Sequence, residues 1–330
     1  MMQPVLFPTF HDAYLAVLEQ VSTRPQFTKP RGNTARECLN ISFALADPRR
    51  RTPNTPARKT NIIFNYAEAL WYLAGRSDAE MIGYYAPRLR ALAADGKQLT
   101  GTAYGPRLFH PQGDSQFDHA MRLLTKDPGS KRAAMVIMRP DEFADPANPD
   151  VACTVGLQFL IRGGQLHTVC FMRGNDAMIG LLCDVFSFTL IAEFAAIQLG
   201  VPLGTYTHHV ASMHLNEPDL PRVRAILAHP SRPPAAAPAM PADTTWQTLD
   251  QVLEWEEELR TNRRRLHPGE AARLPLDPYW QQVLLLLETY RQITHQPHRP
   301  VDADVMAALT PHHHDLISCR WPDRISEADR

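Results

Sequence analysis

Apolar and polar positions near the middle of the chain follow a pattern that predicts a β-hairpin. Residues 151–161 and 165–172 are two apolar runs of β type, and the pair Gly163-Gly164 separates them. Paired glycines between two such runs are typical of a tight hairpin turn. Because the start of one antiparallel strand lies beside the end of the next, Cys153 should lie close to Arg173.

Apolar patterns on both sides of this hairpin predict the other elements of the fold. Helix 60–74 has Thr60 as its expected N-cap and Gly75 as its expected stop. A helix from Asp184 to Leu199 is apolar all round, which indicates a buried core helix. Further helices are expected at residues 11–21, 76–94, 114–125, 246–262 and 277–293, and further strands at residues 38–45, 133–138 and 204–214.

A Pro/Ala-rich stretch divides the chain. We expect a catalytic core at residues 1–228, a linker or long loop at residues 229–245, and a helical C-terminal extension of the same domain at residues 246–330. The basic, proline-containing segment 49–59 should be a solvated loop. The three histidines at 312–314 should be a solvated turn.

Composition narrows the class of protein. The 330 residues are 44% apolar and carry a net charge of −1, which allows a large core and argues against nucleic-acid binding. No run of about eighteen apolar residues indicates a membrane span, and the N-terminus lacks a secretory signal. Five cysteines without CxxC spacing suggest reduced thiols in a cytoplasm. No spacing of His and Cys residues predicts a metal site.

The expected neighbours Cys153 and Arg173 point to nucleophilic catalysis. A guanidinium lowers the pKa of a nearby thiol, and the thiolate is the nucleophile. Glu68 lies in helix 60–74 beside Tyr66 and Leu70. The pattern alone is compatible with a solvent-facing carboxylate and with a buried, functional one.

These residues resemble a motif of the thymidylate synthase family. In that family a nucleophilic Cys opens a strand, Arg-Ser-x-Asp follows a strand later, and a Gly and a pyrimidine-reading Asn come next. Here Cys153, Arg173-Gly174-Asn175-Asp176, Gly180 and Asp184 have the matching spacing. The resemblance runs from about Arg31 to His214. It implies an α+β fold, in which helices pack on one side of a mixed β-sheet and a homodimer forms through the sheets.

The resemblance also implies roles for single residues. Cys153 would be the nucleophile. Glu68 would be the general acid/base, because it begins the run Glu-x-Leu-Trp-Tyr-Leu-x-Gly. Tyr104 would be part of a proton-transfer network. Lys131 and Arg132 would reach the nucleotide phosphate of the partner subunit. The implied substrate-binding residues are Arg31, Lys131, Arg132, Arg173, Gly174, Asn175, Asp176, Asp184, His214 and Asn216.

Some of these positions have plain structural alternatives. Arg31, with Arg36 as a weaker match, could be an ordinary solvated arginine, because isolated arginines are usually surface residues. Tyr104 could be a loop tyrosine that packs against Gly105. His214 could be structural, and Asn216 stands where the family has a Tyr that clasps the 3′-hydroxyl.

The implied reaction is a folate-dependent one-carbon transfer. Thiolate addition at C6 of a pyrimidine nucleotide makes C5 nucleophilic, and C5 attacks the methylene group of 5,10-methylenetetrahydrofolate. Loss of the C5 proton and of tetrahydrofolate leaves an exocyclic methylene. Hydride from folate would turn it into a methyl group, and water would turn it into a hydroxymethyl group. The synthases pack tryptophans on the folate, whereas no Trp lies between Trp71 and Trp246, which fits capture by water.

Three departures from the synthase pattern bear on the substrate. Asp184 replaces the Asn that reads uracil, and a carboxylate accepts a hydrogen bond from the 4-amino group of cytosine. Mispairing would cost about 1–3 kcal/mol, or about tenfold to a hundredfold. The alternative is that Asp184 only caps its helix. Gly174 replaces a Ser, and Lys131 replaces an Arg, both around the phosphate and the ribose. The smaller side chain at Gly174 makes room for a 2′-hydroxyl, so we expect CMP to be preferred over dCMP.

We therefore expect a CMP 5-hydroxymethylase, similar to those of mildiomycin-type antibiotic biosynthesis. The nearest alternatives are a dCMP 5-hydroxymethylase and a thymidylate synthase that methylates dUMP. An alternative of another class is a non-catalytic nucleotide-binding relative.

Overall fold

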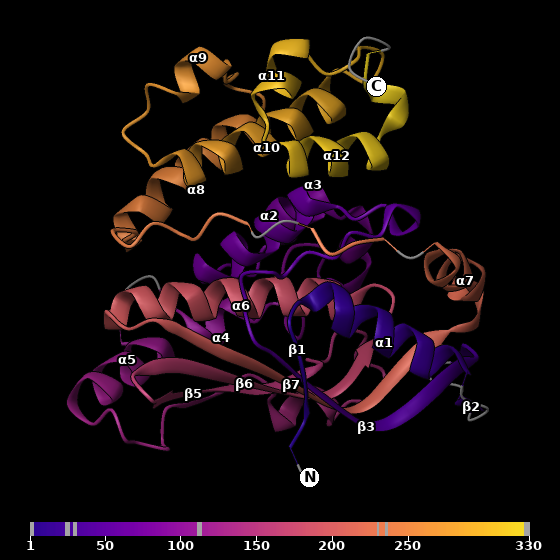
Figure 1. The fold of residues 1–330 in the computed structure, drawn as a ribbon, viewed down its shortest axis with the longest axis vertical. Coiled ribbons are helices and arrows are strands. Elements are labelled where there is room, and N and C mark those ends of the chain that lie inside the picture. The colour runs from indigo at the N-terminus through magenta and orange to yellow at the C-terminus, as the bar shows by residue number, and fades with distance from the viewer. Residues whose placement is uncertain are drawn as a thin grey trace.

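A mixed β-sheet forms the base of the fold (Figure 1). The computed structural model describes residues 3–23, 27–28, 32–110, 114–229, 231–234 and 237–326. The strand order is β1-β3-β7-β6-β5-β4, and β2 pairs with β3. The β1–β3 and β6–β7 pairs are parallel and the others antiparallel, which confirms the expected α+β class. The strands are β1 (Val5–Phe7), β2 (Phe27–Thr28), β3 (Ala35–Leu45), β4 (Ala134–Val136), β5 (Thr154–Arg162), β6 (Gln165–Asp176) and β7 (Leu203–Asn216).

The predicted hairpin is present between β5 and β6. Arg162 pairs with Gln165 across the turn. Gly163 and Gly164 have φ angles of 57° and 74°. A two-residue turn with left-handed backbone at both positions matches the twist of the flanking strands, and glycine adopts that backbone without a steric cost. The hairpin is thus encoded locally, which is why the sequence pattern alone predicts it.

Helices cover one face of the sheet in successive layers (Figure 1). α6 packs on β6 and β7, and α1 packs on β3. α2 packs on α6, and the C-terminal helices α8, α10 and α12 contact α2 or α3. The helices are α1 (Phe10–Thr23), α2 (Ile62–Leu73), α3 (Ala79–Tyr85), α4 (Gly105–Leu108), α5 (Gln116–Lys126), α6 (Gly180–Leu199), α7 (Leu220–Ala228), α8 (Trp246–Arg260), α9 (Pro268–Ala271), α10 (Pro278–His295), α11 (Ala303–Ala308) and α12 (Pro311–Arg320).

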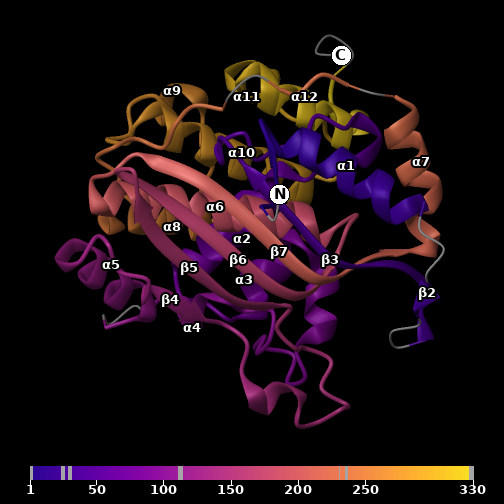
Figure 2. The ribbon, with the colours of Figure 1, turned by 60° about the horizontal axis from the view of Figure 1, so that its bottom comes forward.

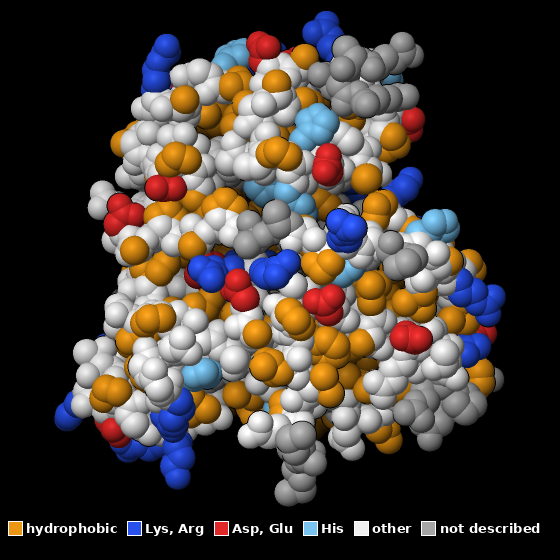
Figure 3. Space-filling model, viewed as in Figure 1, with side chains coloured by type: hydrophobic (Ala, Val, Ile, Leu, Met, Phe, Trp, Pro, Cys, Tyr) orange, Lys and Arg blue, Asp and Glu red, His pale blue; other side chains and the backbone are white. Residues whose placement is uncertain are grey.

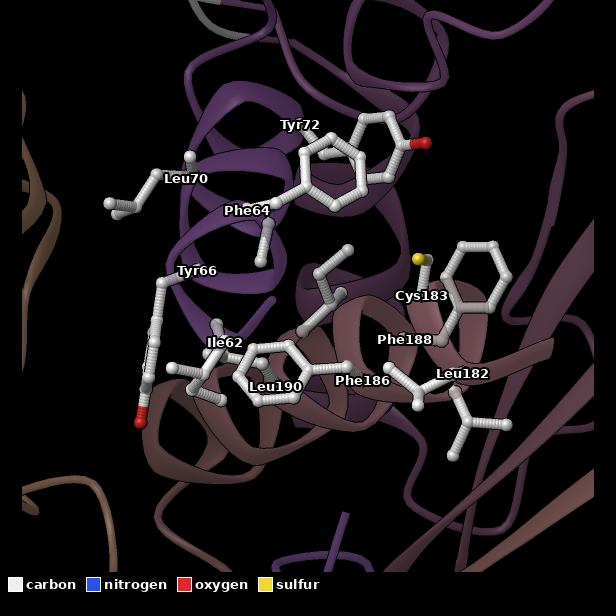
Figure 4. Packing of buried hydrophobic residues seen from close by; sticks show 14 of the residues in the cluster. Ile62, Phe64, Tyr66, Leu70, Tyr72, Leu182, Cys183, Phe186, Phe188 and Leu190 are labelled. Carbon is white, nitrogen blue, oxygen red and sulfur yellow. The ribbon is translucent and has the colours of Figure 1, made fainter. Parts of the chain in front are cut away.

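The contact between α2 and α6 is the centre of the core. Every residue of α2 is buried. Ile62 and Tyr66 of α2 lie beside Phe186 and Leu190 of α6 (Figure 4), and the rings of Tyr66 and Phe186 meet edge to face at 4.9 Å. Full burial of one such side chain stabilises a fold by about 1.5–3 kcal/mol. α2 has no solvent-facing stripe, so Glu68 is a buried carboxylate.

α6 is the only helix of the described residues with the length and apolar composition of a membrane span. Most of its apolar segment is buried inside the fold. Its apolar side chains therefore have protein neighbours on all sides, as predicted for a core helix.

Two helix boundaries differ from the predictions. The Asn61 side chain, not that of Thr60, caps α2 by accepting a hydrogen bond from the Phe64 amide at 3.1 Å. Residues 76–94 do not form one helix: α3 ends at Tyr85, and Pro87 begins a 3-10 helix, Pro87–Leu92. Proline lacks the N–H that would continue the α-helical ladder. Gly75 follows the end of α2 with a φ of 63°, as expected for a helix stop.

Two segments expected in solvent are partly buried. Arg51 lies in the 49–59 segment, and its guanidinium is buried in an ion pair with Glu193 of α6. A buried charge is tolerated when such a partner is present. His312, His313 and His314 belong to helix α12 rather than to a turn. Burial lowers the pKa of His313 to about 4, and its ring lies edge-on to Tyr66. These interpretations were wrong because tertiary contacts, not local polarity, decide burial.

The other face of the sheet carries no helix of the described residues (Figure 2). Strand register aligns Val136, Gly156, Phe171, His209 and Ser42 in one row across β4, β5, β6, β7 and β3. Val136 is 60% exposed and Phe171 is 41% exposed. We call this surface the open face. Elsewhere, on the side of the molecule drawn in Figure 3, described acidic and basic side chains are interspersed.

Candidate active site

Cys153 and Arg173 lie side by side at one end of the hairpin. The Arg173 amide donates to the Cys153 carbonyl at 2.9 Å. The Arg173 Nη2 lies 3.7 Å from the Cys153 Sγ and also donates to the Val151 carbonyl at 3.0 Å, and Nε donates to Ala152 at 2.8 Å. The guanidinium is therefore held on the backbone that leads into the half-buried Cys153. The hairpin register brings the two together as the sequence predicted.

Glu68 of α2 faces α6 in the interior. Ser187 of α6 donates to its Oε2 at 3.2 Å. Burial raises the pKa of Glu68 to about 7, although hydrogen bonds from Ser187 and Tyr72 and the charge of Arg88 oppose the rise. A carboxyl with such a pKa can both give and accept a proton near neutral pH.

Tyr104 is buried between other aromatic rings. It stacks on Tyr72 with ring centroids 5.1 Å apart and on Phe188 at 5.9 Å. Burial raises the pKa of Tyr104 well above its usual range, and the charges of Asp184 and Cys153 raise it further. The phenol thus keeps its proton and interacts electrostatically with residues of two other elements. Tyr104 directly precedes Gly105 at the start of α4, so this packing also agrees with the alternative of a buried loop tyrosine.

Asp184 projects from the second turn of α6. The helix begins at Gly180, and no side chain caps its first residue. The alternative that Asp184 is a helix cap is therefore excluded. Burial raises the pKa of Asp184 well above its usual range and the charge of Glu68 raises it further, while a hydrogen bond with Asn175 lowers it.

A buried hydrogen-bond chain behind Asp184 was not predicted from the sequence. Asn175 Nδ2 lies 3.2 Å from His208 Nε2, and Tyr206 Oη lies 2.8 Å from His208 Nδ1. Burial lowers the pKa of His208 to about 3, so its ring is neutral. Because an amide nitrogen can only donate, Nε2 accepts and the ring proton sits on Nδ1. Successive side chains of a β-strand point to opposite faces of the sheet, so His208 and His209 of β7 lie on opposite faces, but this alternation does not show the link to Asn175.

Asp176, at the end of β6, contacts two other predicted binding residues, Asn216 and His214. Its Oδ2 accepts from Asn216 Nδ2 at 2.8 Å and lies 4.0 Å from His214 Nε2. Its Oδ1 accepts from the amides of Met178 and Ile179 at 3.0 and 2.6 Å. Asp176 therefore fixes the turn from β6 into α6 and orients two side chains of β7.

The residues predicted to bind the nucleotide phosphate lie in different parts of the chain. Arg31 lies outside the described residues. Arg36, the weaker match, donates to the Ser22 carbonyl at 2.6 Å and lies 3.6 Å from Glu217, so it holds β3 to its neighbours. Lys131 and Arg132 are exposed in the turn before β4. Neither forms an ion pair with any acidic residue that the structure describes.

A cavity of about 410 Å³ borders the Glu68 side of the site. Its lining includes Phe64, Ile179 and Leu182, together with four arginines. One of them, Arg88, is close enough for its charge to lower the pKa of Glu68. The lining of the cavity therefore combines apolar side chains with positive charge.

Comparisons with known proteins place this arrangement in a family. The sequence model of the family described as thymidylate synthase matches residues 12–258, more than half of the chain. The chain therefore belongs to the thymidylate synthase family.

Among its relatives are two phage proteins named deoxyuridylate hydroxymethyltransferase. The protein of Bacillus phage SP01 is 30% identical over 216 residues, covering 61% of this chain and 56% of the relative. The protein of Delftia phage PhiW-14 is 28% identical over 214 residues, covering 61% of this chain and 59% of the relative. A thymidylate synthase of Symbiobacterium thermophilum is 26% identical over 200 residues, covering 56% of this chain and 69% of the relative. The chain thus spans less than three fifths of the length of the two phage relatives.

Proposed function

We propose that this protein transfers a one-carbon unit to C5 of a pyrimidine nucleoside monophosphate and leaves it as a hydroxymethyl group, with CMP as the preferred substrate. The observation that carries the proposal is Asp184, a buried carboxyl that is coupled electrostatically to Glu68 and Tyr104. The phage relatives are named for the same kind of transfer to deoxyuridylate.

Each catalytic role follows from a local environment. Cys153 would add to C6 of the base, with Arg173 stabilising the thiolate from 3.7 Å. Glu68, with a pKa of about 7, would take up and return protons near neutral pH. Tyr104 would donate a hydrogen bond because its phenol stays protonated. When bound, 5,10-methylenetetrahydrofolate supplies the one-carbon unit.

Asp184 would select the base. The high pKa of Asp184 favours the neutral carboxyl, which offers one donor and one acceptor. These match N3 and the 4-amino group of cytosine. Asn175 would hold the carboxyl in place, because its own amide is fixed by His208 at 3.2 Å.

Hydroxymethylation of dUMP is the second candidate. Two relatives are named for deoxyuridylate. A neutral Asp184 matches uracil only in the reverse arrangement, in which its hydroxyl donates to O4 and its carbonyl accepts from N3–H, so the base preference depends on which oxygen carries the proton.

Exchange of Asp184 for Asn separates these two candidates. We expect the wild-type enzyme to favour CMP over UMP by about tenfold to a hundredfold in kcat/KM, and Asp184→Asn to reverse the preference, because one mispaired buried group costs about 1–3 kcal/mol. The two nucleotides would be supplied together and their products counted by mass spectrometry. A wild-type preference for UMP or dUMP would favour the second candidate. An unchanged ratio in the variant would remove Asp184 from base recognition.

Two further features support a ribonucleotide and a dimer. Gly174 lies beside the Ser212 carbonyl, where an added Cβ would have 3.6 Å of space, so the glycine is not required by packing. The open face exposes Phe171 and Val136, and exposed apolar side chains on one face of a sheet are typical of interaction surfaces. We propose that a second copy covers this face and receives Lys131 and Arg132 at its phosphate site.

We further propose that residues 246–330 extend the catalytic unit rather than form a separate one, with residues 229–245 as the connection. The contacts of α8, α10 and α12 with α2 and α3 support this division. The segment from His229 to Thr245 contains no helix or strand among its described residues.

A further inference from the structure

The backbone that leads into Cys153 is held by a buried carboxylate from an exposed loop. Glu142 lies in the 3-10 helix Pro140–Phe143, whose other residues are exposed. Glu142 itself is only 6% exposed, and its Oε2 accepts from the Ala152 amide at 2.9 Å. The Ala152 carbonyl in turn accepts from Arg173 Nε at 2.8 Å. Ala152 is therefore held through both its N–H and its C=O, directly before Cys153.

Arg107 balances the charge of Glu142. Its guanidinium is buried in an ion pair with Glu142 and also donates to the Thr100 carbonyl. A buried carboxylate is tolerated when such a partner is present. Arg107 belongs to α4, which begins directly after Tyr104. The ion pair therefore connects the segment of Tyr104 to the segment of Cys153.

Asp150 forms a second connection between the same two segments. Its side chain is buried and accepts from the amides of Thr100, Gly101 and Thr102 at 2.8, 2.8 and 2.7 Å. The two backbones lie so close that a Cβ added at Gly101 would overlap the Asp150 carbonyl, so glycine is required there. Two buried carboxylates thus hold the residues before Cys153 against the loop that precedes α4.

The position of Arg173 depends on this backbone. Its guanidinium donates to the carbonyls of Val151 and Ala152 and lies 3.7 Å from the Cys153 Sγ. The attraction between a guanidinium and a thiolate falls as the distance between them grows. A rotation of either carbonyl would therefore weaken the interaction that favours the thiolate.

We propose that Glu142 is a positioning residue for the nucleophile: by holding Ala152 it keeps the Arg173 guanidinium against the Cys153 sulfur. Arg107 fixes Glu142 in this arrangement. The inference rests on the proposed function, which makes Cys153 the nucleophile. Neither Glu142 nor Arg107 is among the residues that the sequence predicted to act in the site.

The pH profile of Cys153 alkylation tests the inference without any substrate. Iodoacetamide reacts with the thiolate, and mass spectrometry of the peptide that contains Cys153 gives the rate for this cysteine alone. In a variant that combines Arg107→Met with Glu142→Met, neither buried charge is left without its partner, so the protein should fold. We expect the midpoint of its profile to rise by about 0.5–1 pH unit, because Arg173 is no longer held against the sulfur.

Single substitutions at Glu142 separate its position from its charge. Loss of a negative charge near a thiol favours the thiolate and would by itself lower the midpoint. Glu142→Gln loses the charge but keeps an oxygen that can accept from the Ala152 amide, so its midpoint should equal that of the wild type or lie below it. Glu142→Ala also loses the acceptor, so its midpoint should lie at least about 0.5 pH unit above that of Glu142→Gln.

The matched control is Asp141→Asn. Asp141 is the exposed neighbour of Glu142 in the same 3-10 helix, so this variant should stay within about 0.2 pH unit of the wild type at physiological salt. Circular dichroism would confirm that the variants are folded. A midpoint of the paired Met variant at or below that of the wild type would overturn the proposal. So would equal midpoints for Glu142→Gln and Glu142→Ala, a comparison that decides the matter if the paired variant does not fold.

Failure of this proposal and failure of the proposed function would look different. If the midpoints moved as expected but no nucleotide gained a hydroxymethyl group, the positioning role of Glu142 would hold and the proposed reaction would fall. If CMP were converted and the midpoints did not move, the positioning role would fall alone.

Discussion

Replacement of Glu68 by Gln should make the stability of this protein less dependent on pH. The pKa of Glu68 rises from 4.5 to about 7 in the folded protein because the side chain is buried. Between these two values the folded state binds a proton that the unfolded state has lost. Stability contributed by the protonated carboxyl is therefore complete below about pH 4.5 and is lost as the pH rises towards 7.

The size of the effect follows from the same shift. A change of one pKa unit corresponds to 1.36 kcal/mol, so ionisation of buried Glu68 costs the folded state about 3 kcal/mol. Gln is neutral at every pH, and its amide oxygen can still accept the hydrogen bond that Ser187 donates. The variant should thus match the wild type in acid and be more stable by about 3 kcal/mol at alkaline pH.

Urea denaturation followed by circular dichroism measures this difference. Wild type and Glu68→Gln would be compared at about pH 5 and about pH 8.5, so that the titration of all other groups contributes equally to both proteins. The same variant should lose product formation because Gln cannot transfer protons. Parallel pH profiles for the two proteins would refute the reasoning and would show that Glu68 is solvated in solution.

The remaining predictions concern the sugar and the dimer. Gly174→Ser combined with Lys131→Arg should lower the ratio of CMP to dCMP turnover by about tenfold, because the added hydroxyl and the planar guanidinium restrict the position of the nucleotide. Product analysis with both substrates present measures this ratio. An unchanged ratio would exclude these two residues from sugar selection. Phe171→Glu should convert a dimer into a monomer, because it places a charge on the exposed apolar part of the open face. Light scattering measures the mass of the protein in solution. A dimer that survives the change would argue against an interface on this face.

The parts of the fold that could be predicted are those encoded by neighbouring residues. Gly163-Gly164 between two apolar runs fixed the β5–β6 hairpin, and the hairpin register then brought Arg173 to Cys153. The all-round apolar pattern of α6 predicted a buried helix, although the helix begins at Gly180, four residues before Asp184.

What could not be predicted depends on contacts between distant elements. Arg51 looks like a solvated loop residue until Glu193 of α6 is placed next to it. The Asn175–His208 hydrogen bond requires the parallel register of β6 and β7, in which Asp176 is opposite His214 and Cys170 is opposite His208. The cavity beside Glu68 is lined by arginines from Arg58 to Arg320, and no local pattern relates them.

The most direct test of the proposed function is the mass of the nucleotide product. CMP, dCMP, UMP and dUMP would each be incubated with 5,10-methylenetetrahydrofolate and the purified protein, with Cys153→Ala as the control. The account predicts that CMP gains one CH2O group, that tetrahydrofolate rather than dihydrofolate is released, and that the Cys153→Ala protein forms no product. A methyl group on dUMP with release of dihydrofolate would contradict the account, and no product from any of the four nucleotides would contradict catalysis altogether.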